Sequence, residues 1–127
     1  MAKVLNIVTS AYRGTLEEQD DTIIWLTHAM RGAGAEIDVL LQGSAVNYLV
    51  RGQDASGLRF GAWEQTQPPR LDDDLAKLVE KGAKLYAVRE DLAERGIAEA
   101  PLMDGFETIG RRDLARLLNR YERVWQW

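Results

Sequence analysis

Short apolar runs alternate with segments of helical periodicity about five times along this chain. The apolar runs have the length of β-strands that are covered on both faces, and the segments between them are long enough for helices. We expect strands at 4–8, 37–41, 85–88, 106–109 and 123–127. Because alternating strands and helices build parallel crossover units, the pattern predicts an α/β fold, a three-layer α/β/α sandwich with a mainly parallel five-stranded sheet.

Helices are predicted between these strands from the spacing of apolar residues and from capping residues. They are expected at 15–31, 71–81, 90–95 and 112–121, with a short helix at 45–50 and a helical turn at 98–103. Thr15 and Glu18 fit a capping box at the start of the first helix. In that helix Ile23, Leu26 and Met30 recur at helical spacing, so we expect them to face the sheet.

The composition is that of an ordinary globular protein. A length of 127 residues and a hydrophobic content of 46% fit one domain that spans residues 1–127. The net charge of −4 disfavours binding to nucleic acid or to an anionic membrane surface. No apolar stretch approaches the roughly 20 residues of a membrane span, and the run at 4–8 is too short for a signal peptide. We therefore expect a cytoplasmic protein with no nucleic-acid or membrane partner.

The sequence contains no cysteine and one histidine, His28. The lack of cysteine excludes disulfides, thiolate nucleophiles, zinc–thiolate sites and iron–sulfur clusters. His28 is expected to be a packing or surface residue, since a single histidine builds neither a His-rich metal site nor, readily, a Ser–His–Asp triad. The acidic segment 17–21 is interpreted as a solvated helix start, with a divalent-cation site as the alternative. We expect no metal site from these residues and no cofactor, since the sequence has neither the GxGxxG pattern of a dinucleotide site nor a P-loop.

Polar and charged residues follow three of the predicted strands, where the carboxyl ends of parallel strands place ligands in α/β folds. The candidate ligand-binding residues are Thr9, Ser10, Tyr12 and Arg13 after the first strand, Asn47 and Arg51 after the second, and Arg89 and Glu90 after the third. Arginines beside helix N-termini would suit a carboxylate, a phosphate or a sulfur oxyanion. The alternative is that the first loop is a plain solvated connection and that Arg89 pairs with Glu90, Asp91 or another surface acid.

The segment 52–70 has no sustained periodicity and is rich in glycine and proline. Loops of this length are uncommon in compact domains and are usually functional or form interfaces. We interpret it as a packed segment that covers a cleft or a neighbouring chain, with a mobile lid as the alternative. The candidate interface residues are Leu58, Phe60, Trp63, Trp125 and Trp127, because aromatic residues are enriched in interface cores. The other interpretation is that these residues complete the core of a monomer.

Several segments, in their order and spacing, resemble the DsrE family, which includes the TusD-like sulfur-relay proteins. They are KVLNIVT at 3–9, AKLYAV at 83–88, LAERGI at 92–97, LMDG at 102–105 and the ending RVWQW at 123–127. The resemblance spans nearly the whole chain. It implies a compact DsrE-like α/β/α domain that assembles into a homo-oligomer, as a dimer, trimer or hexamer.

The resemblance also implies where a functional cysteine would lie. In the sulfur-relay members, a cysteine near the end of the third strand carries a persulfide. Alignment on Arg95-Gly96 places that position at Val88 or Arg89. Valine has no nucleophile and arginine cannot form a persulfide, so we expect no persulfide chemistry from this chain.

Two functions follow from these observations. The first, which we favour, is a non-catalytic, oligomeric binding or scaffold protein related to sulfur-transfer proteins, with a sulfur-transfer protein as a candidate partner. The alternative is a small-molecule or anion-binding protein, or an enzyme, with a cleft lined by the loops after strands one, two and three. Convergence of Arg13, Arg51 and Arg89 on one pocket would favour the second function. Divergence of these arginines, with Phe60 and Trp63 against another chain, would favour the first.

Overall fold

The computed structural model describes residues 2–11, 21–53, 59–64, 66 and 70–127. Within these ranges, five parallel strands form one sheet in the order β6-β5-β2-β1-β7. The strands are β1 (Lys3–Val8), β2 (Glu36–Leu41), β5 (Leu85–Val88), β6 (Glu107–Ile109) and β7 (Arg123–Gln126). All five predicted strands are present, which confirms the α/β fold and its parallel five-stranded sheet.

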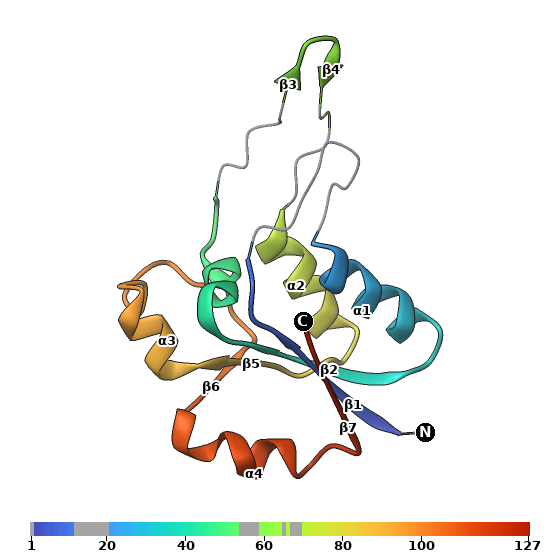
Figure 1. Cartoon of the computed structure of the whole chain (residues 1–127), viewed down its shortest axis with the longest axis vertical. Coiled ribbons are helices and arrows are strands. Elements are labelled where there is room, and N and C mark those ends of the chain that lie inside the picture. Colours follow the sequence, from blue (N-terminus) through green and yellow to red (C-terminus); the bar gives the residue numbers. More distant parts are fainter. Residues whose placement is uncertain (1, 12–20, 54–58, 65, 67–69) are drawn as a thin grey trace.

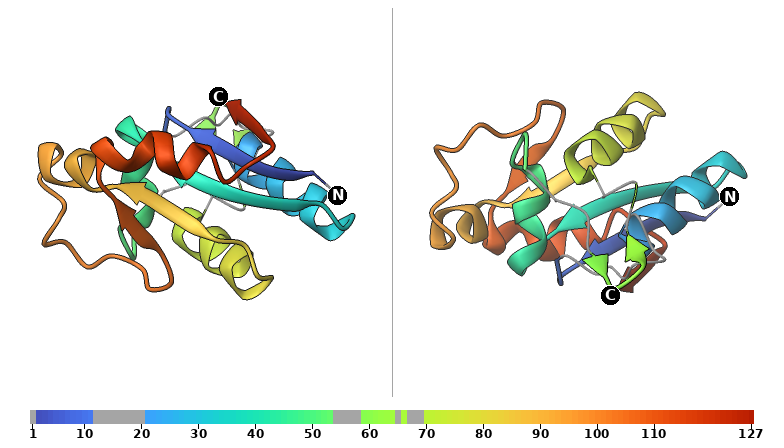
Figure 2. Two further views of the ribbon diagram at one scale, coloured as in Figure 1. Left: turned by 90° about the horizontal axis from the view of Figure 1, so that it is seen from below. Right: turned by 90° about the horizontal axis from the view of Figure 1, so that it is seen from above.

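Helices cover both faces of this sheet and give the fold three layers (Figure 2). One face carries α1 (Thr22–Gly32), the 3-10 helix η1 (Gly43–Leu49), α2 (Leu71–Glu80) and α3 (Arg89–Glu94), and the other carries α4 (Leu114–Leu118). Strand side chains alternate between the two faces, so that on β5 Leu85 and Ala87 join the core under α1 and α2, while Tyr86 and Val88 join the core under α4. None of the helices in the described ranges is long and apolar enough to cross a membrane.

Helix α1 has a different start from the one that the sequence predicted. Its N-cap is Asp21, whose carboxylate accepts hydrogen bonds from the amides of Ile23 and Ile24 at 2.8 and 3.2 Å. The predicted capping box of Thr15 and Glu18 lies outside the described residues, as does most of the acidic segment 17–21. Asp21, the one described member of that segment, therefore serves as a helix cap.

The side that helix α1 turns to the sheet agrees with the prediction at Ile23 and differs from it at Leu26 and Met30. Its buried residues are Ile23, Ile24 and Thr27. The prediction that Leu26 and Met30 face the sheet is wrong, because both are only partly buried. The reason is a buried polar contact with β1: the hydroxyl of Thr27 accepts a hydrogen bond from the side-chain amide of Asn6 at 2.9 Å. A pattern that counts only apolar residues as buried cannot reveal such a contact.

Three predicted helical segments differ from the observed ones. The short helix expected at 45–50 is the 3-10 helix Gly43–Leu49. The helix expected at 112–121 is divided into the 3-10 helix η2 (Arg111–Asp113) and α4. Of the helical turn expected at 98–103, the first part is a single hydrogen-bonded turn, in which the Ala100 amide donates to the Ile97 carbonyl at 3.0 Å. The rest is not helical, because it pairs with the chain after η1: Val50 and Leu102 form an antiparallel bridge, and the amide of Met103 donates to the Leu49 carbonyl at 2.8 Å.

The segment 52–70 contains a β-hairpin that the sequence did not predict. Strands β3 (Arg59–Phe60) and β4 (Trp63–Glu64) pair antiparallel, with Phe60 opposite Trp63. Gly61 begins the two-residue turn with a φ of 59°, which glycine adopts without strain. Figure 1 shows that the hairpin stands away from the sheet and its helices, at the end of the longest axis of the molecule.

Candidate functional site

The loops that follow β1 and β2 are joined at the carboxyl-terminal edge of the sheet, where parallel sheets usually carry their sites. The Thr9 hydroxyl accepts a hydrogen bond from the side-chain amide of Gln42 at 3.0 Å. The Thr9 carbonyl accepts one from the Ser44 hydroxyl at 3.2 Å, and the Ser44 oxygen accepts one from the Ala11 amide at 3.0 Å. The turn after β2 is thereby held against the loop after β1.

Gly43 lies in the middle of this edge and contacts the loops on both sides. Its φ of 56° lies in the left-handed region, and an added Cβ would come within 3.1 Å of the Thr9 carbonyl oxygen. Its amide donates to the Asp91 carboxylate at 2.8 Å, and its carbonyl accepts from Arg95 Nε at 3.0 Å. Two charge-assisted hydrogen bonds therefore fasten α3 to the turn after β2.

Arg111, two residues after β6, binds three carboxylates of α3. Its backbone amide donates to the Glu90 carboxylate at 2.9 and 3.1 Å, and its guanidinium contacts Asp91 at 2.7 Å and Glu94 at 3.4 Å. The hydrogen bond from the Arg111 amide lowers the pKa of Glu90, and the hydrogen bond to Asp91 raises the pKa of Arg111. The acids of α3 thus hold the loop after β6 in place.

A cavity of about 530 Å³ opens beside these contacts. Its lining residues are Gly43, Asn47, Asp91, Glu94 and Arg95. Of the predicted ligand-binding residues, the lining includes Asn47. Two carboxylates face one guanidinium, so the lining is not the arginine-rich surface that an anion would favour. Among the described residues, no group of three or more side chains could hold a metal ion.

The other predicted ligand-binding residues near this edge differ in their exposure to solvent and in their contacts, and none of the described ones lines the cavity. Thr9 is partly buried and takes part in the contacts between the loops, whereas Ser10 is exposed. The carboxylate of Glu90 is bound by the Arg111 amide. Tyr12 and Arg13 lie outside the described residues.

Arg51 and Arg89 lie at opposite ends of β6. Arg51 pairs at 2.6 Å with Asp104, which precedes the strand. The guanidinium of Arg89 lies over Gly110, the residue directly after the strand, with Nη1 3.4 Å from the position of an added Cβ. In the described part of the chain Arg89 forms no ion pair. The alternative, in which Arg89 pairs with Glu90 or Asp91, is not observed as an ion pair, because Arg111 occupies the carboxylates of α3; the nearby charge of Arg89 still helps the Arg111 amide to lower the pKa of Glu90.

The two residues that the resemblance aligns with a persulfide cysteine lie at the junction of β5 and α3. Val88 is 1% exposed and packs in the core under α4. Arg89 is the first residue of α3 and is exposed. Of the two positions that the resemblance aligns with the cysteine, one is therefore buried and the other presents a guanidinium at the edge of the sheet.

Asp91, Glu94, Arg95 and Arg111 make most of the polar contacts at this edge, and the sequence-based candidates did not include them. A signal was present in the sequence. Asp91 and Arg95 are four residues apart in a helix that directly follows a buried strand, which places both on one helix face. Arg111 follows the next predicted strand, and the carboxyl ends of parallel strands share one edge of the sheet.

The candidate interface residues fall in two regions. Phe60 and Trp63 lie on the hairpin and are 64% and 69% exposed. Trp125 is partly buried on β7, and Trp127 follows it, exposed, with its indole nitrogen donating to the Asn6 side-chain oxygen at 3.0 Å. Leu58 lies outside the described residues. The interface itself stays a prediction.

Comparison with known proteins agrees with this architecture. The model of the DsrE/DsrF-like family matches residues 2–127 of the chain. The crystal structure of the YchN protein from E. coli has 22% sequence identity and a TM-score of 0.77, with 100% of each chain covered. The structure of MTH1491 from Methanobacterium thermoautotrophicum, a protein of unknown function, has 15% identity and a TM-score of 0.56, with 96% of each chain covered. At these identities the two structures show a common fold alone. No curated protein matches the chain.

Proposed function

We propose that this chain, which belongs to the DsrE/DsrF-like family, is a binding or scaffold protein that assembles into a homo-oligomer and transfers no persulfide. The sequence has no cysteine, so the chain has no thiol on which a persulfide could form. In a sulfur-transfer process its role would be that of a subunit that binds a thiol-bearing partner protein.

The observation that carries this proposal is the aromatic face of the β3–β4 hairpin. Phe60 and Trp63 are cross-strand partners, so their side chains share one face, and both are largely exposed. Their neighbours Arg59 and Glu64 form an ion pair at 2.8 Å and belong to the other face. The hairpin thus has one apolar face and one charged face. An apolar face that projects from a single chain gains free energy when another chain covers it.

A second copy of the chain is the partner that we favour. Around a two-fold axis, the same aromatic pair from each copy can meet its counterpart, which gives a self-complementary contact. Val124 and Trp127 are two further exposed apolar side chains, on and beside β7 at one edge of the sheet, and they face opposite sides of it. Exposed apolar side chains at this edge, apart from the hairpin, support a trimer or hexamer as well as a dimer, because each copy can contact two neighbours.

The small-molecule or anion-binding alternative has weaker support. The cavity of about 530 Å³ lies within the roughly 300–1,000 Å³ range of small-molecule sites. However, its charged lining residues are two acids and one arginine, and Arg51 and Arg89 lie at opposite ends of β6. Among the described residues, Arg51 and Arg89 therefore do not converge on one pocket that would bind an anion.

The test is native mass spectrometry combined with analytical ultracentrifugation on protein purified gently at micromolar concentration. The aromatic variant is Phe60→Ser/Trp63→Ser, and the matched control, on the other face of the same hairpin, is Arg59→Ser/Glu64→Ser. We expect an oligomeric wild type and an oligomeric control. The aromatic variant is expected to dissociate at least about 30-fold more readily, which corresponds to about 2 kcal/mol for the loss of a buried aromatic contact.

A monomeric wild type would contradict the proposal, and so would an aromatic variant that assembles as tightly as the wild type. A reproducible extra mass on each subunit of the wild type would instead support the ligand-binding alternative. The same mass spectrum therefore distinguishes the two functions.

A further inference from the structure

Strand β7 is one edge of the sheet, and its outer side carries unpaired backbone groups. Next to its last residue, the Trp127 amide donates to the Ile7 carbonyl at 2.9 Å, and the Trp127 carbonyl accepts from the Thr9 amide at 3.1 Å. Backbone groups alternate in direction along a strand, so Val124 and Gln126 turn their amides and carbonyls away from β1. Among the described residues, no backbone group bonds to these outward-facing amides and carbonyls.

The side chains of β7 that face α1 are an arginine and two tryptophans. Arg123, Trp125 and Trp127 alternate along the strand direction and therefore share one face of the sheet. This is the α1 face, because the Trp127 indole donates to the side chain of Asn6, which itself bonds Thr27 of α1. Trp125 is partly buried and Trp127 is 40% exposed. The edge of the sheet thus has exposed aromatic surface beside its free backbone groups.

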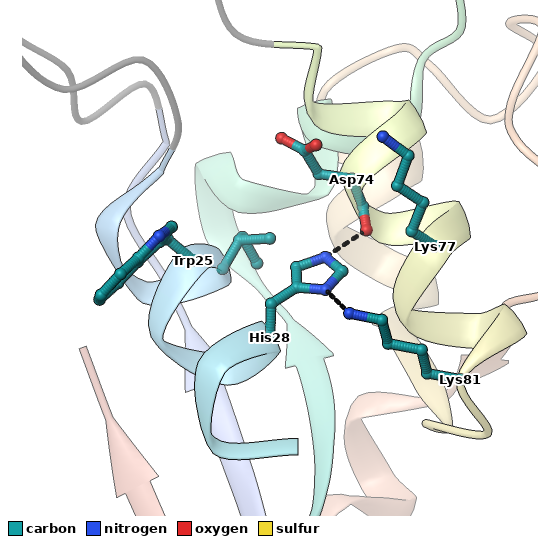
Figure 3. A pocket seen from close by; sticks show the side chains of 6 residues that line it. Trp25, His28, Asp74, Lys77 and Lys81 are labelled. Atoms are coloured by element: carbon teal, nitrogen blue, oxygen red, sulfur yellow. Dashed lines mark hydrogen bonds between the residues drawn. The ribbon is translucent and has the colours of Figure 1, made fainter. Parts of the chain in front are cut away.

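Helix α1 adds a further exposed aromatic side chain on this face. His28 bridges α1 to α2, with its Nε2 2.8 Å from the backbone carbonyl oxygen of Asp74 (Figure 3). The ring of Trp25, which is 58% exposed, points away from α2, toward the side of α1 on which β7 lies (Figure 3). An edge strand with free backbone groups and exposed aromatic neighbours is a template for another strand.

We propose that β7 pairs antiparallel with β7 of a second copy of this chain, around a two-fold axis perpendicular to the sheet. The two parallel sheets then join into one continuous sheet. This inference rests on the homo-oligomeric assembly proposed above and assigns one of its contacts to a surface other than the hairpin. A second copy is the favoured occupant because the edge is complementary to itself, in its backbone groups and in its side chains.

The backbone groups select one register for this pairing. When Trp125 lies on the two-fold axis, Val124 of each copy faces Gln126 of the other. Every outward-facing amide of one copy then meets an outward-facing carbonyl of the other. A register centred on Val124 would instead set Gln126 opposite Glu122, whose amide already donates to the Lys3 carbonyl at 2.9 Å. The register centred on Trp125 is therefore the one that satisfies the edge.

The side chains fit the same register. Trp125 lies directly opposite its counterpart on the α1 face, where the two indoles can pack against each other. Arg123 lies opposite Trp127 of the second copy, so its guanidinium can lie over the indole in a cation–π contact. The two-fold axis repeats this contact, so each copy contributes both the cation and the ring.

The first experiment uses single introduced cysteines, because the chain has none of its own. Trp125→Cys sets each thiol opposite its counterpart, with Cα atoms about 4.5 Å apart, which suits a disulfide. The control is Val124→Cys, at a more exposed position that would lie about 8 Å from its counterpart, too far for a disulfide. Both variants are oxidised with diamide and separated on a non-reducing gel.

The second experiment removes one outward-facing donor from each copy. Val124→Pro deletes an amide that points away from β1, so the strand can still pair with β1. Val124→Ala keeps this amide and is the matched control. Circular dichroism shows whether each variant is folded, and analytical ultracentrifugation measures its assembly. We expect the β7 contact of Val124→Pro to be on the order of 10-fold weaker or more, and that of Val124→Ala to stay within about 3-fold of wild type.

We expect a disulfide-linked dimer from Trp125→Cys and little from Val124→Cys. The Phe60→Ser/Trp63→Ser background should leave this crosslink in place, because the hairpin does not form the β7 contact. The inference is overturned if Trp125→Cys does not crosslink, if Val124→Cys crosslinks as readily, or if a folded Val124→Pro assembles as wild type does. If Val124→Pro does not fold, the two cysteine variants decide the matter.

The outcomes separate this contact from the function proposed above. An oligomeric wild type without a Trp125→Cys crosslink would overturn the β7 contact and leave the scaffold function standing. A Trp125→Cys crosslink, combined with a hairpin variant that assembles as tightly as the wild type, would support the β7 contact and contradict the role of the hairpin.

Discussion

Replacement of Tyr121 by phenylalanine is expected to destabilise the fold by about 2 kcal/mol, since it removes a hydrogen bond to a buried carboxylate. The carboxylate belongs to Asp38 on β2, which is 5% exposed. One carboxylate oxygen accepts the Tyr121 hydroxyl at 2.6 Å, and the other accepts the Lys84 amide at 2.8 Å. The substitution removes the hydroxyl alone and leaves one buried oxygen without its donor.

The assay is urea unfolding followed by circular dichroism. Hydrogen bonds to charged groups contribute roughly 1.5–3 kcal/mol, so with an m-value of about 2 kcal/mol/M the midpoint should fall by roughly 1 M. Asp38→Asn and the double variant complete a mutant cycle, in which a coupling above about 1 kcal/mol is expected between Asp38 and Tyr121. All samples need one protein concentration, because assembly makes stability depend on concentration. A loss below about 0.5 kcal/mol for Tyr121→Phe would refute the reasoning.

The same pair predicts a pH dependence on the alkaline side. Burial, and then the hydrogen bond with Asp38, raise the pKa of Tyr121 above its ordinary value of 10.0. The unfolded chain therefore releases this proton first, so the contribution of Tyr121 to stability is fully present below pH 10 and decreases as the pH rises further. Because phenylalanine has no such proton, the stability gap between wild type and Tyr121→Phe should narrow from about pH 9 to about pH 11. A constant gap would contradict the expected shift.

Three further changes have defined outcomes. Gly43→Ala is expected to cost about 1–3 kcal/mol, because alanine is strained at a φ of 56° and its methyl group would approach the Thr9 carbonyl; an unchanged melting temperature would contradict this. The Arg111 amide lowers the pKa of Glu90 below its ordinary value of 4.5. The ionised carboxylate therefore stabilises the fold at pH values above 4.5, and this contribution is lost as the pH falls through the lowered pKa. Urea titrations should therefore show wild type and Glu90→Gln converging in stability from about pH 7 to about pH 3. His28→Ala is expected to cost roughly 1–2 kcal/mol through loss of the bridge between α1 and α2, and faster hydrogen exchange in α1 would be the local signature.

The parallel sheet could be predicted from the sequence because each of its strands is a local pattern. The run 85–88 is continuously apolar, since its side chains enter the two cores alternately. Helix α2 was equally predictable, because Leu71, Leu75 and Leu78 recur at helical spacing and are all buried. Such patterns depend on neighbours in the sequence and do not require knowledge of which strands are adjacent.

The candidate site could be predicted only as far as the edge of the sheet. The contact of Arg111 with Asp91 exists because β6 lies next to β5, and the sequence does not reveal this strand order. The buried side of α1 depends on the hydrogen bond between Thr27 and Asn6. A hydrophobic pattern treats both residues as polar and therefore does not predict that they are buried against each other. The β3–β4 hairpin was not predicted, because strands of two residues are too short to show the alternation of apolar and polar residues that identifies a strand.

The place of β7 in the sheet has a consequence for how the newly made chain folds. Strand β7 pairs with β1 through contacts such as Val4 with Arg123, so more than 100 residues after β1 must be synthesised before β1 gains its second neighbour. Closing so long a loop is slow, and until then β1 has one unpaired edge. On the ribosome, β1 and β2 can pair early, but the open side of β1 is available to strands of other molecules. Docking of β7 covers this open side of β1 and makes β7 the edge strand of the sheet.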